Sequence, residues 1–112
     1  MAGTTPIIEI YSAGPTTVVG FGGRDLFDDI NLAVCRDEML RLIEETNCEV
    51  LAFDLAGVKL IPSGLLGLLA SVRQHDVEVH LYNPSEDVRE VLSVTGLDQI
   101  MPIHDIDVER AE

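Results

Sequence analysis

Residues 50–72 constrain the fold more than any other part of this 112-residue chain, and they read VLAFDLAGVKLIPSGLLGLLASV. The stretch begins with an apolar run, 50–53, that does not alternate with polar residues, which predicts a strand covered on both faces. Pro62, Ser63 and Gly64 then open a second run of Leu and small residues that predicts a helix. Because sites in open α/β sheets gather beyond the carboxyl ends of strands, we expect the functional site at this junction.

The rest of the chain predicts strands alternating with helices. The expected strands are 7–11, 16–21, 49–54, 77–82 and 99–103, and the expected helices are 30–46, 63–74 and 84–95. The short link between the first two strands makes them an antiparallel hairpin. The alternation that follows predicts an α/β fold: a mixed sheet of four to five strands with an N-terminal hairpin and about three main helices packed on it.

Residues with capping chemistry set the expected helix boundaries. Asp28 or Asp29 can cap the first helix, because a short carboxylate accepts hydrogen bonds from free backbone N–H groups. For the third helix we expect Asn83 as the cap and Pro84 at the first helical position, with Gly96 ending the helix. The buried stripe of this helix is expected to hold Val88, Val91 and Leu92.

The sequence predicts one domain, 6–104, with loose termini at 1–5 and 105–112. No apolar stretch is long enough to span a bilayer, and residue 1 is not followed by a signal peptide pattern, so a cytoplasmic location is expected, with no membrane insertion. Cys35 and Cys48 form no CxxC pair and are expected to be buried, reduced thiols.

The formal charge of −13 argues against direct nucleic-acid binding, which needs clustered Lys and Arg. It also argues against adsorption to anionic membranes. The charge would steer a basic protein partner toward the chain, or it simply aids solubility, and composition leaves both interpretations open.

No catalytic residue, metal site or cofactor is predicted. Ser63 lacks the G-x-S-x-G pattern of a nucleophile elbow, and His75, His80 and His104 are scattered along the chain without a clear triad logic. The glycines at 20–23 lack the phosphate-loop pattern, and the acidic residues show no metal-site spacing.

Ser63 is therefore a helix cap or a modification site, and its residue type fits both. Pro62 restricts Ile61 to extended backbone, which places Ser63 at the N-cap or in the first turn of the helix. A phosphate on Ser63 would be favoured by the helix dipole. It would add about two negative charges at pH 7 without melting the helix, so it would act on a partner's surface.

The helix that follows carries more apolar surface than one face needs. Its buried side is expected to hold Leu65, Leu68, Leu69 and Val72. Leu66, Gly67 and Ala70 remain on a different side, which is either covered internally or offered to another protein.

Three motifs in the right order resemble STAS domains, in particular anti-sigma factor antagonists. Residues 50–58, VLAFDLAGV, resemble the family's strand ending in D-L-S-x-V, and residues 62–67, PSGLLG, resemble its S-S-G-L-G or S-S-x-x-L-G loop and helix start. Residues 85–97, SEDVREVLSVTGL, are close to S-x-x-V-R-x-x-L-x-x-T-G-L. The resemblance extends from Ile7 to about Ile103.

The resemblance implies a STAS fold and a non-enzymatic binding module of the cytoplasm. Its unphosphorylated form would bind an anti-sigma factor that is also a serine kinase. Phosphorylation of Ser63 would break that complex, and a PP2C-type phosphatase would restore it. The expected partner-binding residues are Pro62, Ser63, Gly64, Leu66, Gly67 and Ala70.

The loop departs from the family pattern, because Ile61 and Pro62 stand where many members have Asp-Ser. A kinase that reads that Asp would not find it here. Two alternatives therefore stand beside the switch: a phosphorylation-independent STAS subunit of an ABC lipid-transport or sensory assembly, and a domain that senses a nucleotide or small ligand with the same loop.

Overall fold

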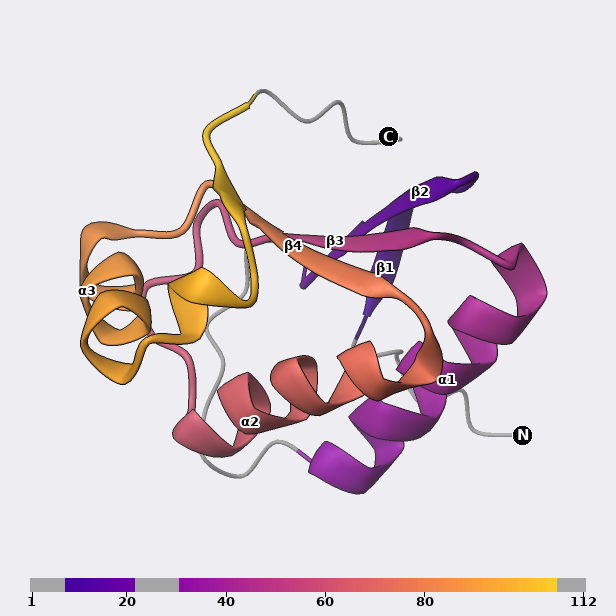
Figure 1. Cartoon of the computed structure of the whole chain (residues 1–112), viewed down its shortest axis with the longest axis horizontal. Helices are drawn as coiled ribbons and strands as arrows, with labels where there is room; N and C mark the ends of the chain where they lie inside the picture. The colour runs from indigo at the N-terminus through magenta and orange to yellow at the C-terminus, as the bar shows by residue number, and fades with distance from the viewer. Residues whose placement is uncertain (1–7, 22–30, 107–112) are drawn as a thin grey trace.

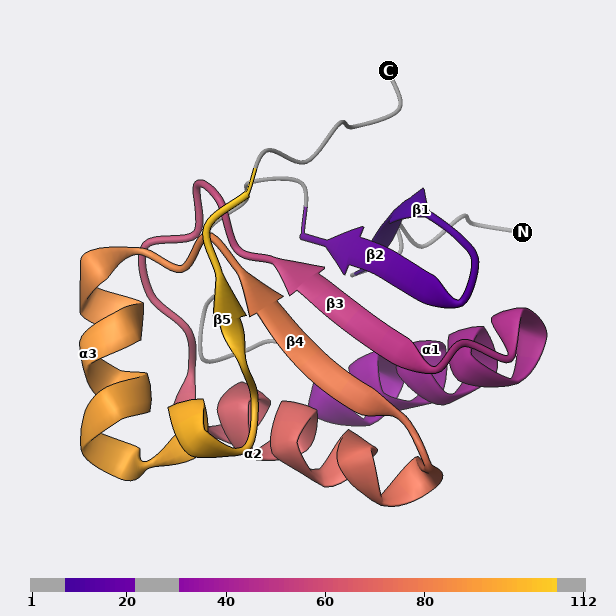
Figure 2. The same cartoon turned by 45° about the horizontal axis from the view of Figure 1, so that its top comes forward.

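The computed structural model describes residues 8–21 and 31–106. Within these residues five strands form one sheet in chain order: β1 (Glu9–Ser12), β2 (Thr16–Gly20), β3 (Val50–Asp54), β4 (Glu78–Tyr82) and β5 (Ile103–His104). β1 and β2 pair antiparallel, and every later pair is parallel (Figure 2). The predicted mixed sheet with an N-terminal hairpin is confirmed.

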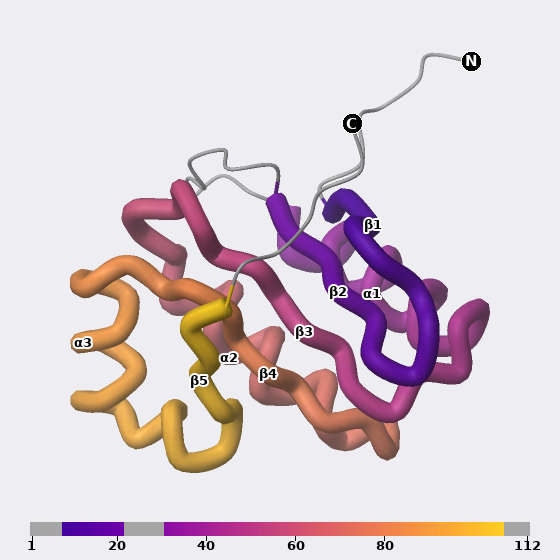
Figure 3. Tube along the Cα trace, turned by 90° about the horizontal axis from the view of Figure 1, so that it is seen from above, coloured from indigo at the N-terminus to yellow at the C-terminus, as the bar shows by residue number. Residues whose placement is uncertain are grey.

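Three α-helices connect the parallel strands: α1 (Leu32–Thr46), α2 (Ser63–Val72) and α3 (Glu86–Thr95). Short 3₁₀ turns extend two of them, η1 (Arg73–His75) after α2 and η2 (Leu97–Gln99) after α3. α1 and α2 lie side by side under one face of the sheet, and α3 lies beyond its β5 edge (Figures 1 and 2). In the described part of the chain, no helix covers the opposite face, which is turned toward the viewer in Figure 3.

The core lies between the sheet and the helices, and β3 is its centre. Leu51, Ala52 and Phe53 are all fully buried, as their non-alternating apolar run predicts for a strand between two neighbours. The Phe53 ring stacks on Phe21 with centroids 6.2 Å apart. From the helix-covered side of the sheet, Met39 of α1 packs into the same core.

Two of the expected caps differ in the structure. Asn31 caps α1, its Oδ1 accepting from the Val34 N–H at 3.1 Å, while Asp28 and Asp29 lie outside the described residues. Ser85, and not Asn83, caps α3, so the third helix begins two residues later than predicted. The reason is that Asn83 takes a left-handed conformation, with φ of 57°, and uses its amide elsewhere.

The last strand is also shorter than the expected 99–103. Gly96 ends α3 in the left-handed conformation, as predicted, but residues 97–99 then form η2 before the chain can extend. Asp105 and Ile106, assigned from sequence to a loose tail, make defined contacts: Asp105 Oδ1 accepts from Arg89 Nη2 at 2.7 Å. Residues 1–7 and 107–112, which include the rest of the expected loose ends, lie outside the described part.

Both cysteines are free and buried, as expected. Burial, and to a lesser extent the nearby charge of Glu38, raise the pKa of the Cys35 thiol from 9.0 to about 12. Between about pH 9 and pH 12, the Cys35 thiol therefore keeps its proton in the folded chain and loses it in the unfolded chain. The stability linked to Cys35 is fully present below about pH 9 and falls as the pH rises toward 12.

Because the thiolate is the reactive form, we expect Cys35 of the native chain to resist iodoacetamide at about pH 8.5, and to react once guanidinium unfolds the chain. Mass spectrometry of the alkylated chain measures this. Modification of Cys35 at equal rates in the native and unfolded chains would contradict its placement in the core.

Candidate functional site at the start of helix α2

Ser63 is the first residue of α2 and is exposed. Pro62 holds the N-cap position with ψ of 141°, and its carbonyl accepts from the Leu65 N–H at 3.0 Å. No side chain caps α2, and among the described residues the Ser63 hydroxyl makes no hydrogen bond. Of the two roles that the sequence leaves open, the cap is therefore not found, and the hydroxyl faces solvent at the tip of the helix.

The start of α2 differs from the starts of the other two α-helices. Side chains of Asn31 and Ser85 cap α1 and α3, whereas α2 has no side-chain cap. Its first turn, like that of α1, contains no acidic residue. A missing cap costs about 1 kcal/mol of helix stability. It also leaves backbone N–H groups and the positive end of the helix dipole open to an anion beside Ser63.

Five of the six expected partner-binding residues are at least partly exposed, and the sixth, Leu66, is buried. Ser63, Gly64 and Gly67 are exposed, and Pro62 and Ala70 are partly exposed. Ser63, Gly67 and Ala70 follow the i, i+4, i+7 spacing of one helical stripe. We call Pro62, Ser63, Gly64, Gly67 and Ala70 the α2 stripe.

Leu66 does not belong to this stripe, contrary to the expectation. It is only 3% exposed and lies in the core cluster. The reason is that Leu66 belongs to the same buried cluster as Val88 of α3 and lines one hollow with it. The sequence pattern identified the sheet-facing side of α2, but it carried no information on where α3 would pack.

A shallow apolar groove lies next to the α2 stripe, and no sequence pattern predicts it. Leu60 and Ile61 of the loop before α2 form one wall, and Val88 and Val91 of α3 form the other. Leu66 and Asp87 complete the lining. Leu60 is 64% exposed, and Val91, predicted on the buried stripe of its helix, is 43% exposed.

Asp54, the acid at the end of β3, is held inside the fold. It is 3% exposed, and its Oδ1 accepts from the Ala56 N–H and from Asn83 Nδ2, both at 3.2 Å. Asn83 also pairs with Ile106, donating to its carbonyl at 2.6 Å and accepting from its N–H at 2.9 Å. We call this set the Asp54–Asn83–Ile106 latch. It fixes the strand ends that carry the loop before α2.

The histidines are not as scattered as the sequence suggests. His80 and His104 lie 3.1 Å apart, nitrogen to nitrogen, whereas His75 lies in η1. In the described residues neither these nor any other side chain hydrogen-bonds the Ser63 hydroxyl, so the arrangement lacks the paired base of a serine nucleophile.

Within 8–21 and 31–106, no three His, Cys, Asp or Glu side chains group as a metal site. No helix in these ranges is long and apolar enough to cross a bilayer.

The two glycines of α2 differ in the space around them. A Cβ at Gly67 meets nothing within 4 Å, whereas a Cβ at Gly64 would lie 2.8 Å from Leu32 Cδ1 of α1. We expect Gly67→Ala to raise the free energy of unfolding by about 1 kcal/mol, because Ala is the better helix former. Gly64→Ala should gain less, because Leu32 must move. Urea denaturation measures both, and an equal or larger gain at Gly64 would contradict the close α1–α2 contact.

Comparison with solved structures supports the same architecture. The structure titled "NMR Structure of the protein TM1081" aligns with a TM-score of 0.61 and 24% sequence identity, over 79% of this chain and 74% of that one. At this identity the likeness shows the fold. No curated protein sequence matches the chain.

The sequence model of the STAS domain matches residues 14–109, which span the sheet from β2 to β5 and all three α-helices. This range includes the exposed serine at the start of α2 and the latch at the end of β3. The chain therefore belongs to the STAS domain family, a family of regulatory binding modules.

Proposed function

We propose that this chain is a cytoplasmic anti-sigma factor antagonist that is switched by phosphorylation of Ser63. The unphosphorylated chain binds an anti-sigma factor with serine kinase activity, and a PP2C-type phosphatase reverses the modification. The observation that carries the proposal is the exposed Ser63 hydroxyl at the uncapped start of α2.

The local electrostatics favour a phosphate without unfolding the domain. A phosphoserine adds about two negative charges at pH 7, and the free N–H groups of a helix start are a natural place for them. The first turn of α2 contains no acidic side chain that would repel the phosphate. The modified chain thus stays folded, and the added charge acts on whatever is docked against the helix start.

The α2 stripe and the groove beside it together form the proposed docking surface. Gly67 lacks a side chain and has open space around it, so a partner's backbone can approach closely. Leu60 supplies exposed apolar area at the neighbouring groove, with Asp87 at its rim. A negative charge placed on Ser63 would have to be desolvated under a bound partner, which weakens the complex.

One observation favours a second candidate function, binding without phosphorylation. Ile61 is partly buried against the core and Pro62 occupies the N-cap, where many family members have Asp-Ser. The loop therefore offers a kinase apolar contacts in place of a carboxylate. In this case the chain would act as a constitutive STAS subunit of an ABC lipid-transport or sensory assembly.

The switch is tested with Ser63→Asp. We expect it to weaken binding to the anti-sigma kinase at least about tenfold, which is 1.4 kcal/mol, while leaving thermal stability equal or higher, because an acid in the first helical turn is favourable. Calorimetry measures the affinity of each purified anti-sigma kinase of the source organism for the original chain and for Ser63→Asp. Incubation with ATP and the kinase that binds should add one phosphate, which Ser63→Ala abolishes.

Ser71 provides the matched control, since it is an exposed serine in the same helix, eight positions further on. Ser71→Asp should leave the affinity unchanged. If the kinase binds Ser63→Asp as tightly as the original chain, the phosphorylation switch is wrong and the constitutive subunit is favoured.

The groove is tested independently with a pair of α3 substitutions. Val91→Lys places a charge in the groove and should weaken partner binding by about 1–2 kcal/mol or more, the range of a central interface residue. Val94→Lys is the control, because Val94 is 80% exposed on the same helix and does not line the groove. Equal affinities for the two variants would place the docking surface elsewhere.

A further inference from the structure

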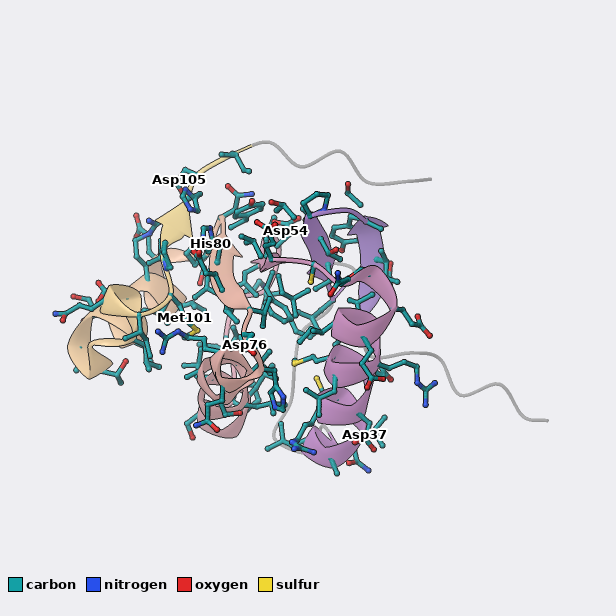
Figure 4. All side chains as sticks on the ribbon, turned by 45° about the vertical axis from the view of Figure 1, so that its right-hand side comes forward. Asp37, Asp54, Asp76, His80, Met101 and Asp105 are labelled. Carbon is teal, nitrogen blue, oxygen red and sulfur yellow. The ribbon has the colours of Figure 1, made fainter. Side chains whose placement is uncertain are left out.

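A histidine pair lies on the sheet face opposite the helices of the core. His80 of β4 and His104 of β5 come from adjacent parallel strands, and His104 Nε2 is 3.1 Å from His80 Nδ1. Their rings are nearly parallel, 23° apart, with centroids separated by 5.0 Å. Tyr82 packs edge-on against His104. The α2 stripe lies on another side of the molecule, and Figure 4 shows His80 away from α2, near Asp54.

A carboxylate determines which nitrogen of His80 is free. Glu78 Oε1 lies 3.1 Å from His80 Nε2, and an ionised carboxylate only accepts hydrogen bonds. Nε2 therefore carries the proton, and Nδ1 presents its lone pair toward His104. A metal-binding histidine has the same arrangement, in which the other ring N–H donates to a carboxylate that orients the ring and raises its basicity.

The separation of the two facing nitrogens suits a shared metal ion. Two imidazole nitrogens bound to tetrahedral Zn²⁺ at about 2.0–2.1 Å stand roughly 3.3 Å apart. The observed 3.1 Å is close to this value. The ion would replace the proton that now joins the rings, once His104 carries its own proton on Nδ1 and both rings tilt so that their lone pairs converge on the ion. Both strands are already held in register there, since the His104 carbonyl accepts from the Asn83 N–H at 2.8 Å.

We propose that His80 and His104 bind a divalent transition-metal ion of the zinc type, with Glu78 orienting His80 and water filling the other coordination positions. The ion joins the two-residue strand β5 to β4, and so fastens the end of the sheet that also carries the Asp54–Asn83–Ile106 latch. This site is independent of Ser63 and of the proposed switch.

Calorimetric titration of the full chain with zinc chloride tests the site, with Mg²⁺ as the hard-cation comparison. We expect one Zn²⁺ per chain, no comparable Mg²⁺ binding, and a loss of affinity of at least about tenfold in His80→Ala and in His104→Ala. His75→Ala is the matched control and should bind as the original chain does, because His75 lies in η1. Glu78→Gln should weaken binding about 10- to 100-fold.

A second measurement does not depend on how the variants fold. In ¹⁵N spectra of the original chain, one equivalent of Zn²⁺ should shift His80 Nδ1 and His104 Nε2, and leave the His75 nitrogens unchanged. Acidification should release the ion, because imidazole must lose its proton to bind a metal. Unshifted His80 and His104 nitrogens, or equal Zn²⁺ affinity in His75→Ala and His80→Ala, would overturn the proposal and assign the binding to scattered surface carboxylates.

Discussion

The burial of β3 between two parallel neighbours is the constraint on which the rest of this structure depends. Leu51 and Phe53 point into the core and are fully buried, and Ala52 on the other face is buried as well. A strand that pairs in parallel with a neighbour on each edge needs a crossover connection to each of them. Helices α1 and α2 supply these two crossovers. The chain must therefore leave β3 at one edge of the sheet and return beneath it, which sets where α2 begins.

Polar contacts at that edge hold the ends of β3 and β4 and the segment after β5 together. Asp54 and Asn83 end adjacent strands, and their side chains join each other and the segment after β5. The desolvation of a carboxylate buried to 3% exposure is compensated by these hydrogen bonds. Their effect is to fix the strand ends from which the loop toward Ser63 leaves. Because Ser63 lies at the surface, the proposed modification would change the surface and not the core.

The two candidate sites belong to different parts of the same scaffold and use different chemistry. At the start of α2, an uncapped helix end and small residues offer a place where charge can be added and a partner can approach. On the other side of the sheet, two imidazoles meet across parallel strands beside a carboxylate. The first depends on helix electrostatics and an apolar groove, and the second on strand register. Neither site requires the other, so the proposed partner binding and the proposed ion binding can be tested separately.

Local apolar periodicity and the restriction that Pro62 imposes are enough to predict the order of elements, the N-terminal hairpin, the central strand and the position of Ser63 at a helix start. They do not predict that Leu66 is internal, that Asn83 joins the latch in place of capping α3, or that His80 meets His104. These outcomes depend on how α3 packs against α2 and on the β4–β5 register. Both are contacts between residues distant in the chain, which leave no local pattern to read.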